Sequence, residues 1–265
     1  MATAPIFETI EFIVENGVGV LKLNRPESMN AMNSQLCKDI HGGLRAVAAD
    51  KSIRALVITG NGRAFCAGAD QKPGAALPPP NDASQLIRDY LNPVYELLNE
   101  LDVPKIAAVN GAAAGAGMSL ALNCDIVFAG RSAYFLAAFV NQALVADTGA
   151  SWWLANGVGV PRANGVLMLN ERLPAEKAAD WGMIWRCVED ADLMPEAMAV
   201  AVKLAQGPTV ALGLTARLTR NAVRNSVLEQ MRLETEYQNI ARYTDDRQEA
   251  RQAFSARRAP NFQGR

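Results

Sequence analysis

Two runs of small residues follow predicted strands in this chain and could hold a developing negative charge. The first, Ala67-Gly68-Ala69, comes after a predicted strand over residues 55–59, and the second, 111–117, comes after a predicted strand over 106–109. Small residues let another atom approach the backbone, and N–H groups in the first turn of a helix have no intrahelical partner. An isolated Gly/Ala run more often serves helix packing, so the presence of two runs is what favours an anion-stabilising site.

The remaining side chains offer little for metal or zinc chemistry. The single histidine, His41, lies on a predicted helix and is expected at its surface. The cysteines are widely spaced and form no CxxC pair, so they are predicted to be reduced, buried small residues: Cys37, Cys66, Cys124 and Cys187. We therefore expect no metal site.

Composition limits the possible partners. The chain has 265 residues, half of them apolar, with 26 basic and 27 acidic side chains. This balance gives no field for nucleic acid, although a local site for one phosphorylated small molecule stays open. No basic segment precedes an apolar core at the N-terminus, and no apolar run reaches membrane-spanning length. We expect a cytoplasmic protein that binds neither nucleic acid nor membranes.

Strands and helices alternate through the first half of the chain and would position the two runs. Residues 10–14 and 18–23 predict a hairpin around Asn16-Gly17, and a helix with Ser34 as its N-cap follows. Residues 71–84 are rich in proline and predict a surface loop, either a lid or pocket wall or a plain excursion. The pattern over 86–101 predicts a helix that is kinked or broken at Pro93.

Helices dominate the second half. Short strands are predicted over 126–129 and 133–136, an apolar helix begins near Trp152, and further helices are predicted near 163–169, 174–181, 193–206 and 228–241. The last one places Leu228, Met231, Thr235 and Gln238 at one-turn spacing, a mixed face that could pack on a neighbouring subunit. The sequence predicts an α/β core over 1–200 and a helical region over 201–265, without a separating linker.

Five fragments in order resemble the crotonase family, also called the enoyl-CoA hydratase/isomerase superfamily. They are Asn24-Arg25-Pro26-Glu27 with Asn30-Ala31-Met32, the stretch 64–70, the stretch from Asn110-Gly111 to Cys124-Asp125, the stretch 178–183, and the stretch 260–265. The resemblance implies a spiral of ββα repeats with a C-terminal helical trimerisation region. It also implies a homotrimer or a dimer of trimers.

The resemblance further implies an acyl-CoA thioester as substrate, with no cofactor besides the coenzyme A carried by that substrate. Carried onto this chain, the family's oxyanion-hole donors are the backbone N–H groups of Ala69 and Ala116. Two fixed donors would stabilise the enolate that forms when the thioester loses its α-proton. The positions that the family places near coenzyme A are Arg25, Ala67, Asp70, Gln71 and Lys72.

The side chains that decide the reaction depart from the hydratase pattern. The two glutamates of family hydratases would fall at Ser119 and Phe139, and neither residue can serve unaided as a base. Asp147 offers a replacement, because its Asp-Thr-Gly context resembles the family's isomerases with a catalytic aspartate. The alternative is that Asp147 caps a helix beginning near Ser151, or a turn. Phe139 would then line the acyl pocket or simply pack in the core.

We therefore predict an acyl-CoA isomerase, acting on an enoyl-CoA or a ring-type phenylacetyl-CoA, with Asp147 as the acid and base. An enoyl-CoA hydratase, or a related lyase or hydrolase, is the alternative among enzymes. A catalytically weak scaffold subunit that binds CoA thioesters is the alternative from another class.

Overall fold

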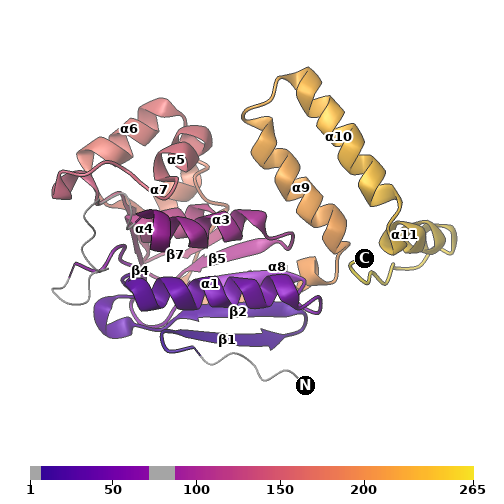
Figure 1. The fold of residues 1–265 in the computed structure, drawn as a ribbon, viewed down its shortest axis with the longest axis horizontal. Helices are drawn as coiled ribbons and strands as arrows, with labels where there is room; N and C mark the ends of the chain where they lie inside the picture. Colours follow the sequence, from indigo (N-terminus) through magenta and orange to yellow (C-terminus); the bar gives the residue numbers. More distant parts are fainter. Residues whose placement is uncertain (1–6, 72–86) are drawn as a thin grey trace.

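Each turn of the chain places one strand in each of two sheets (Figure 1). The larger sheet contains, in order across it, β1 (Ile10–Glu15), β2 (Val18–Leu23), β3 (Ala55–Gly60), β5 (Lys105–Val109), β7 (Ile126–Gly130) and β10 (Arg186–Val188). The smaller sheet contains β4 (Ala64–Cys66), β6 (Ala112–Ala114), β8 (Tyr134–Leu136) and β9 (Leu173–Pro174). This computed structural model describes residues 7–71 and 87–265, so Lys72 and the rest of the predicted loop lie outside the described residues.

The turns stack because like strands pair in parallel. In the larger sheet β2, β3, β5, β7 and β10 run parallel, and in the smaller sheet β4, β6 and β8 do the same. Only the outer strands β1 and β9 pair antiparallel with their neighbours among the described residues. Consecutive strands such as β3 and β4, or β5 and β6, lie in different sheets, so the chain winds as a spiral. The predicted α/β class with ββα repeats is confirmed.

Helices follow the strands and cover the sheets. Those of the core are α1 (Ser34–Ala49), α3 (Asn92–Glu100), α4 (Ala116–Leu122), α5 (Ala150–Val158), α6 (Val160–Leu169), α7 (Ala175–Asp180) and α8 (Leu193–Ala205). The C-terminal ones are α9 (Thr209–Ala222), α10 (Val227–Arg242) and α11 (Asp245–Ser255). Short helical turns occupy Pro26–Ser28, Ile87–Leu91, Val140–Gln142 and Asp190–Asp192.

Alternation along the strands divides the core between two faces of the larger sheet. On β2, Leu21 and Leu23 belong to the cluster that includes the apolar stripe of α1, whereas Val18 and Val20 belong to the cluster that includes α8. Strand β3 repeats the pattern. Because successive side chains of a strand point to opposite faces, both faces of this sheet are apolar and each is covered by a helix.

Several sequence predictions need correction at element ends. The N-cap of α1 is Asn33, whose side chain accepts a hydrogen bond from the Leu36 amide at 2.8 Å, and Ser34 is the first helical residue. The Gly/Ala run 111–117 contains a short strand, β6, before α4 begins. The break predicted at Pro93 is present, since a π-helical turn ends at Leu91 and α3 begins at Asn92. The hairpin is confirmed, with Asn16 and Gly17 both at positive φ.

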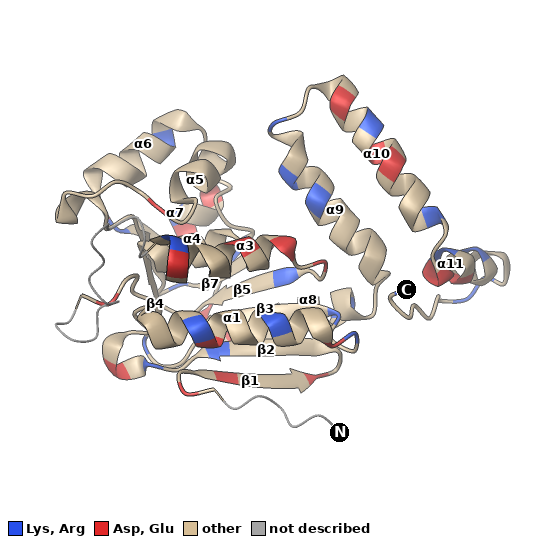
Figure 2. Cartoon of the chain, in the orientation of Figure 1, with Lys and Arg blue, Asp and Glu red and all other residues tan. Residues whose placement is uncertain are grey.

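The C-terminal helices were only partly predicted. Helices α9 and α11 were missed; α11 buries only Asp246 and Ala253, so its sequence carries no apolar stripe. Helix α8 packs on the larger sheet, and residue 200 lies inside it. Helices α9, α10 and α11 extend away from the sheets; α9 carries only basic charges, whereas α10 and α11 carry charges of both signs (Figures 1 and 2). We propose to place the boundary of the helical region after α8.

Within residues 7–71 and 87–265, no single helix is long and apolar enough to cross a membrane. One bent helix pair, Asp190–Ala205 with Thr209–Ala222, meets the requirements for a membrane span by length and composition alone.

All four cysteines are free thiols, and Cys187 is the one that is only partly buried. Burial raises the pKa of Cys37, Cys66 and Cys124 to about 12, so these thiols stay protonated and serve as small apolar groups.

Candidate active site

The first run of small residues is held by a short parallel bridge. The Met32 amide donates to the Gly68 carbonyl at 2.7 Å, and the Asp70 amide donates to the Met32 carbonyl at 2.9 Å. In such a bridge the flanking residues make the hydrogen bonds, so the N–H of Ala69 faces the opposite side. The run is therefore fixed in place while its central amide is left available.

The second run ends in the first turn of a helix. Gly115 has φ +50 and is the N-cap residue of α4, and Ala116 is the first helical residue. A β-carbon at Gly117 would lie 2.1 Å from the Cys66 carbonyl oxygen, so only glycine lets α4 start this close to β4. Among the described residues, neither the Ala116 amide nor the Ala69 amide donates a hydrogen bond.

The structure brings the two runs side by side. A β-carbon at Gly68, which has φ +88, would lie 2.9 Å from the Ala114 carbonyl oxygen and 3.6 Å from the Ala116 nitrogen. A β-carbon at Gly115 would lie 3.9 Å from the Gly68 Cα and 4.0 Å from Cε1 of the Phe139 ring. Two backbone amides without partners thus come close to each other, and the buried Phe139 ring borders the same place.

Tyr95 lies between the Ala116 turn and the segment that carries Asp147, because it contacts Ala116 and lines one hollow together with Thr148. The hydroxyl of Tyr95 on α3 donates to the Ala116 carbonyl at 2.6 Å. Burial, then Cys66 and Cys37, and then the charge of Asp147 raise the pKa of Tyr95, while a hydrogen bond from Thr148 opposes the rise. Tyr95 therefore touches the start of α4 on one side and has the Asp147-Thr148 pair as neighbours on the other.

The carboxylate of Asp147 is suited to accept a proton. Its side chain is half-buried, and this burial raises its pKa above the usual aspartate value, although a hydrogen bond from the Thr148 hydroxyl at 3.2 Å works against the shift. The N-cap of α5 is Gly149, and no side chain caps that helix. Asp147 therefore does not cap α5, and its catalytic role stays a prediction.

Two residues expected to bind coenzyme A pair with each other. Nη2 of Arg25 lies 2.9 Å from Oδ2 of Asp70, and Nη1 of Arg25 donates to the Ala31 carbonyl. The Asp70 side chain is 2% exposed and that of Arg25 is 13% exposed. This ion pair fastens the 67–70 turn to the segment after β2, and contact of the two residues with coenzyme A stays a prediction.

The other predicted positions are spread around the turn. Ala67 is half-buried and donates its amide to the Met29 carbonyl at 3.0 Å, and Gln71 is exposed. Ser119 is fully buried, with its hydroxyl 3.5 Å from the Gly115 carbonyl oxygen. No carboxylate stands at Ser119 or Phe139, so any acid or base at this site comes from elsewhere. Sequence reasoning did not single out Tyr95, which follows Val94 in the predicted helix over 86–101.

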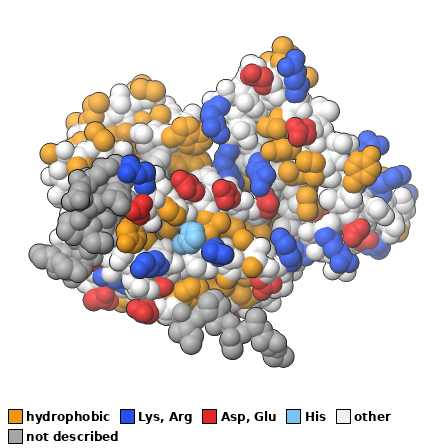
Figure 3. Space-filling view, in the orientation of Figure 1, with side chains coloured by type: hydrophobic (Ala, Val, Ile, Leu, Met, Phe, Trp, Pro, Cys, Tyr) orange, Lys and Arg blue, Asp and Glu red, His pale blue; other side chains and the backbone are white. Residues whose placement is uncertain are grey.

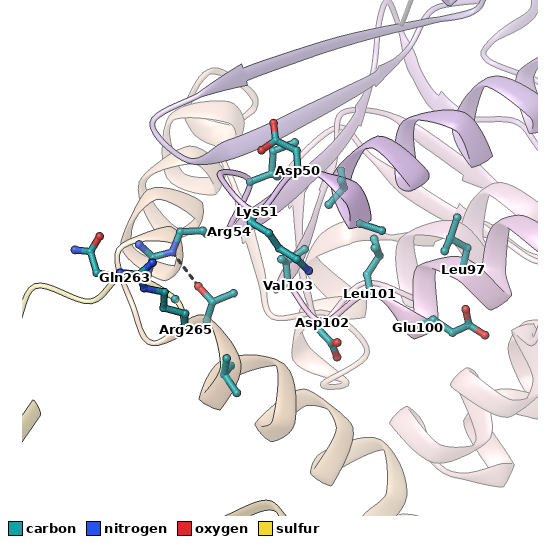
Figure 4. Close-up of a pocket in the computed structure, with 16 residues that line it drawn as sticks. Asp50, Lys51, Arg54, Leu97, Glu100, Leu101, Asp102, Val103, Gln263 and Arg265 are labelled. Carbon is teal, nitrogen blue, oxygen red and sulfur yellow. Dashed lines mark hydrogen bonds between the residues drawn. The ribbon is translucent and has the colours of Figure 1, made fainter. Parts of the chain in front are cut away.

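A hollow lies at the other end of the sheet. The carboxyl edge of the larger sheet, where β3, β5 and β7 end, leads into the two runs; the amino edge is where these strands begin. A hollow of about 780 Å³ lies at the amino edge, between residues 50–54, residues 101–103 and the C-terminal tail (Figure 4). It is lined by none of the predicted site residues. Among the described residues, no group of three or more His, Cys, Asp or Glu side chains is arranged to hold a metal ion.

Comparison with known proteins agrees with this geometry. Residues 14–265 match the family described as Enoyl-CoA hydratase/isomerase. The chain is 42% identical over 261 residues to the 1,2-epoxyphenylacetyl-CoA isomerase of Escherichia coli, covering 97% of this chain and 100% of that protein. It is 38% identical over 259 residues to a probable enoyl-CoA hydratase of Rhodobacter capsulatus, covering 98% and 99%.

A solved structure gives the same result for the fold. The crystal structure of enoyl-CoA hydratase from Bacillus anthracis superposes with a TM-score of 0.90 at 27% identity, covering 97% of this chain and 100% of that one. The stacked ββα turns therefore define a crotonase-type enzyme. The chain belongs to the enoyl-CoA hydratase/isomerase family, and the family resemblance expected from its sequence fragments is confirmed.

Proposed function

We propose that this enzyme isomerises an acyl-CoA thioester through an enolate held by the amides of Ala69 and Ala116. The observation that carries the proposal is Asp147, a half-buried carboxylate with a raised pKa whose neighbour Thr148 lines one hollow with Tyr95, the residue that contacts the Ala116 turn. The positions of the two hydratase glutamates hold Ser119 and Phe139 instead. One carboxylate is enough for an isomerisation, because the same group removes the proton and returns it.

The chemistry follows from the geometry of donors and base. The thioester carbonyl oxygen would accept from the two amides, which lowers the free energy of the enolate relative to the neutral ester. Asp147 would take a proton from one carbon of the acyl chain and return it to another, leaving the carboxylate as it began. The substrate class is an enoyl-CoA or, by analogy with the relative from Escherichia coli, a 1,2-epoxyphenylacetyl-CoA.

Coenzyme A would be bound by the segment around the first turn. We propose that Arg25, Ala67, Asp70, Gln71 and Lys72 contact its nucleotide and pantetheine, as the family resemblance implies. No cofactor besides the coenzyme A of the substrate is needed for the proposed proton transfer.

Hydration is the second candidate, favoured by the relative named as a probable enoyl-CoA hydratase. It requires a water molecule held by Asp147, with the Ser119 hydroxyl as a possible second contact. Because Ser119 is fully buried and its hydroxyl faces the Gly115 carbonyl, it supports this role less well than a carboxylate would. A hydrolase would need the same water, whereas a lyase would use Asp147 to move a proton.

Isotope exchange separates these candidates. The enzyme is incubated in deuterated water with 3-hexenoyl-CoA, 2-hexenoyl-CoA and 1,2-epoxyphenylacetyl-CoA. Migration of the double bond or ring isomerisation supports the proposal, formation of 3-hydroxyhexanoyl-CoA supports a hydratase, and binding without turnover supports a scaffold. Asp147→Asn should abolish isomerisation while the exposed Asp180→Asn control retains it; full turnover by Asp147→Asn would contradict the assignment.

We also propose assembly as a homotrimer or a dimer of trimers. Helix α10 has no buried residue, and four of its hydrophobic side chains are mostly or half exposed: Val227, Leu228, Met231 and Ile240. Figure 3 shows hydrophobic side chains on the exposed surface of the C-terminal helices. Sedimentation equilibrium of the intact protein tests the assembly, and a monomer at micromolar concentration would contradict it.

A further inference from the structure

Asn30 is a fully buried polar residue in the segment between β2 and α1. Oδ1 of its side chain accepts from the Arg25 amide at 2.8 Å. Nδ2 donates to the Asn61 carbonyl at 3.0 Å and to the Ala64 carbonyl at 2.8 Å. A buried side-chain amide with partners for both its oxygen and its nitrogen is satisfied, and it fixes the stretches that it joins. Asn30 therefore ties segment 25–32 to the turn between β3 and β4.

The backbone of this segment also depends on residue 30. Met29 and Asn30 have φ values of 52° and 55°, in the left-handed region that asparagine adopts more readily than most residues besides glycine. The turn after β3 fits closely around the Asn30 side chain, because a β-carbon at Gly60 would lie 2.7 Å from Nδ2 of Asn30 and 2.4 Å from the Ala64 carbonyl oxygen. Both the side-chain amide and the left-handed backbone are thus built into this part of the fold.

Segment 25–32 in turn holds the turn that carries Ala69. The Met29 carbonyl of the segment accepts from the Ala67 amide at 3.0 Å. Met32 bonds the residues on either side of Ala69 through its own amide and carbonyl, at 2.7 Å and 2.9 Å. The backbone on both sides of the Ala69 amide is therefore bonded to the segment that Asn30 fixes.

The direction of the Ala69 amide has to come from these neighbours. Its N–H donates no hydrogen bond within the described residues, so no bond of its own fixes where it points. The ion pair between Arg25 and Asp70 is one more link from the same segment to the same turn. An error in the position of the segment would therefore pass directly to the amide.

We infer that Asn30 is a positioning residue, whose side chain fixes segment 25–32 so that the segment aims the Ala69 amide into the space beside the Ala116 amide. This inference rests on the proposed function, in which the two amides bind the thioester oxygen. Asn30 acts only through the segment.

Two variants of Asn30 test this role through turnover. Asn30→Gly removes the side chain and keeps the left-handed backbone accessible. With saturating 3-hexenoyl-CoA, kcat should fall about 10- to 100-fold, because a small displacement of a group that stabilises the transition state costs this much. Asn30→Asp keeps the acceptor for the Arg25 amide and tolerates the same φ, but it lacks the donating amide group, so kcat should also fall.

Infrared difference spectroscopy separates positioning from general stability. The probe is hexanoyl-CoA labelled with carbon-13 at the thioester carbonyl, a saturated ester with no double bond to move. Bound at saturation to the wild type, its carbonyl stretch should lie below its frequency in water, because two amides polarise the bond. In both Asn30 variants the frequency should lie closer to the value in water. An unchanged frequency in the folded variants would overturn the inference.

Asp39 supplies a matched control. Its side chain is also buried, at 7% exposure, and accepts hydrogen bonds from the Glu8 amide and from the amide and hydroxyl of Thr9. Asp39→Ala should lower the melting temperature and leave kcat per folded molecule and the carbonyl frequency at their wild-type values. An equal frequency change in Asp39→Ala, or failure of both Asn30 variants to fold, would assign Asn30 to stability alone and overturn the inference.

Failure of this inference is distinguishable from failure of the proposed function. If the wild type lowers the carbonyl frequency and the Asn30 variants lower it equally, only the role of Asn30 is wrong. If the wild type leaves the carbonyl at its frequency in water, the two amides do not bind the thioester oxygen, and the proposed oxyanion site is itself wrong.

Discussion

The polar groups at the two edges of the larger sheet differ in whether they have hydrogen-bond partners within the protein. At the carboxyl edge, the amides of Ala69 and Ala116 have no hydrogen-bond acceptor among the described residues, and burial raises the pKa of Asp147. At the amino edge, the guanidinium of Arg54 donates to the Thr209 hydroxyl at 2.9 Å, to the Phe262 carbonyl at 3.0 Å and to the Gly207 carbonyl. The carboxyl edge therefore has hydrogen-bond donors available for a substrate, whereas the donors at the amino edge stabilise the fold.

Lys105 shows the same principle within the amino edge. Its ammonium is fully buried, lies 3.0 Å from the Asp125 carboxylate, and donates to the carbonyls of Leu101 and Val103. Asp125 in turn pairs with Arg220 of α9 at 3.0 Å. Polar groups that have hydrogen-bond partners stabilise the fold. Buried amides without partners destabilise the fold and stay available to bind a substrate. Substitutions at the two edges should therefore affect different measurements.

Asp147→Asn should give the largest loss of activity without a loss of stability. Loss of the acid-base group is expected to reduce isomerisation about 10³-fold. The melting temperature should stay equal or rise, because a carboxylate whose folded pKa is raised opposes folding once it ionises. The wild type should accordingly lose stability relative to the variant as the pH rises through the Asp147 pKa. A fall in melting temperature at pH 7 would contradict the prediction that Asp147 serves activity and not stability.

Ala116→Pro removes one proposed oxyanion donor. Ala116 is the first residue of α4, a position where proline is tolerated because its missing N–H has no helical partner. We expect kcat to fall about 10²- to 10³-fold with the circular-dichroism spectrum preserved. Equal activity in a folded variant would remove this amide from the mechanism.

Asp125→Asn should act on stability and leave the reaction alone. Removing the carboxylate that pairs with the fully buried Lys105 ammonium should lower the free energy of unfolding by about 3 kcal/mol. Burial already lowers the pKa of Lys105, so the loss should shrink at alkaline pH as the amine releases its proton. Urea denaturation at several pH values measures this, with kcat per folded molecule as the control. A large change in kcat would contradict the division of roles.

Arg54→Lys is expected to have the smallest effect. One ammonium cannot reproduce the forked contacts of the guanidinium to Thr209, Gly207 and Phe262, so the free energy of unfolding should fall by about 1–2 kcal/mol. Figure 4 shows Arg54 between the amino edge and the tail that carries Gln263 and Arg265. Hydrogen exchange should quicken at residues 262–265 while the amides of α1 keep their protection.

Local sequence patterns predicted the repeating core well. The Asn16-Gly17 turn, the apolar strands and the run before α4 each carry their signal within a few residues. The exposed and polar α11 carries no such signal. The N-cap of α1 is Asn33 and not Ser34, because the Asn33 side chain accepts a hydrogen bond from the Leu36 amide.

The candidate site was predictable only where small residues mark it. The runs containing Ala69 and Ala116 are visible as sequence, and the family resemblance pointed to Asp147. Tyr95 was not predicted because its hydrogen-bond partner, the Ala116 carbonyl, lies on another element that the spiral brings close. The mutual pairing of Arg25 and Asp70 was likewise hidden by their separation along the chain.

The stacked turns have a consequence for folding. The site draws Met32, Ala69, Ala116 and Asp147 from successive windings, so no single winding of the chain contains it. Such non-local contacts form late, after most loop-closure entropy has been lost. During refolding, recovery of turnover should therefore lag behind recovery of the helical circular-dichroism signal. Enzyme activity would then report the last step in the assembly of the chain.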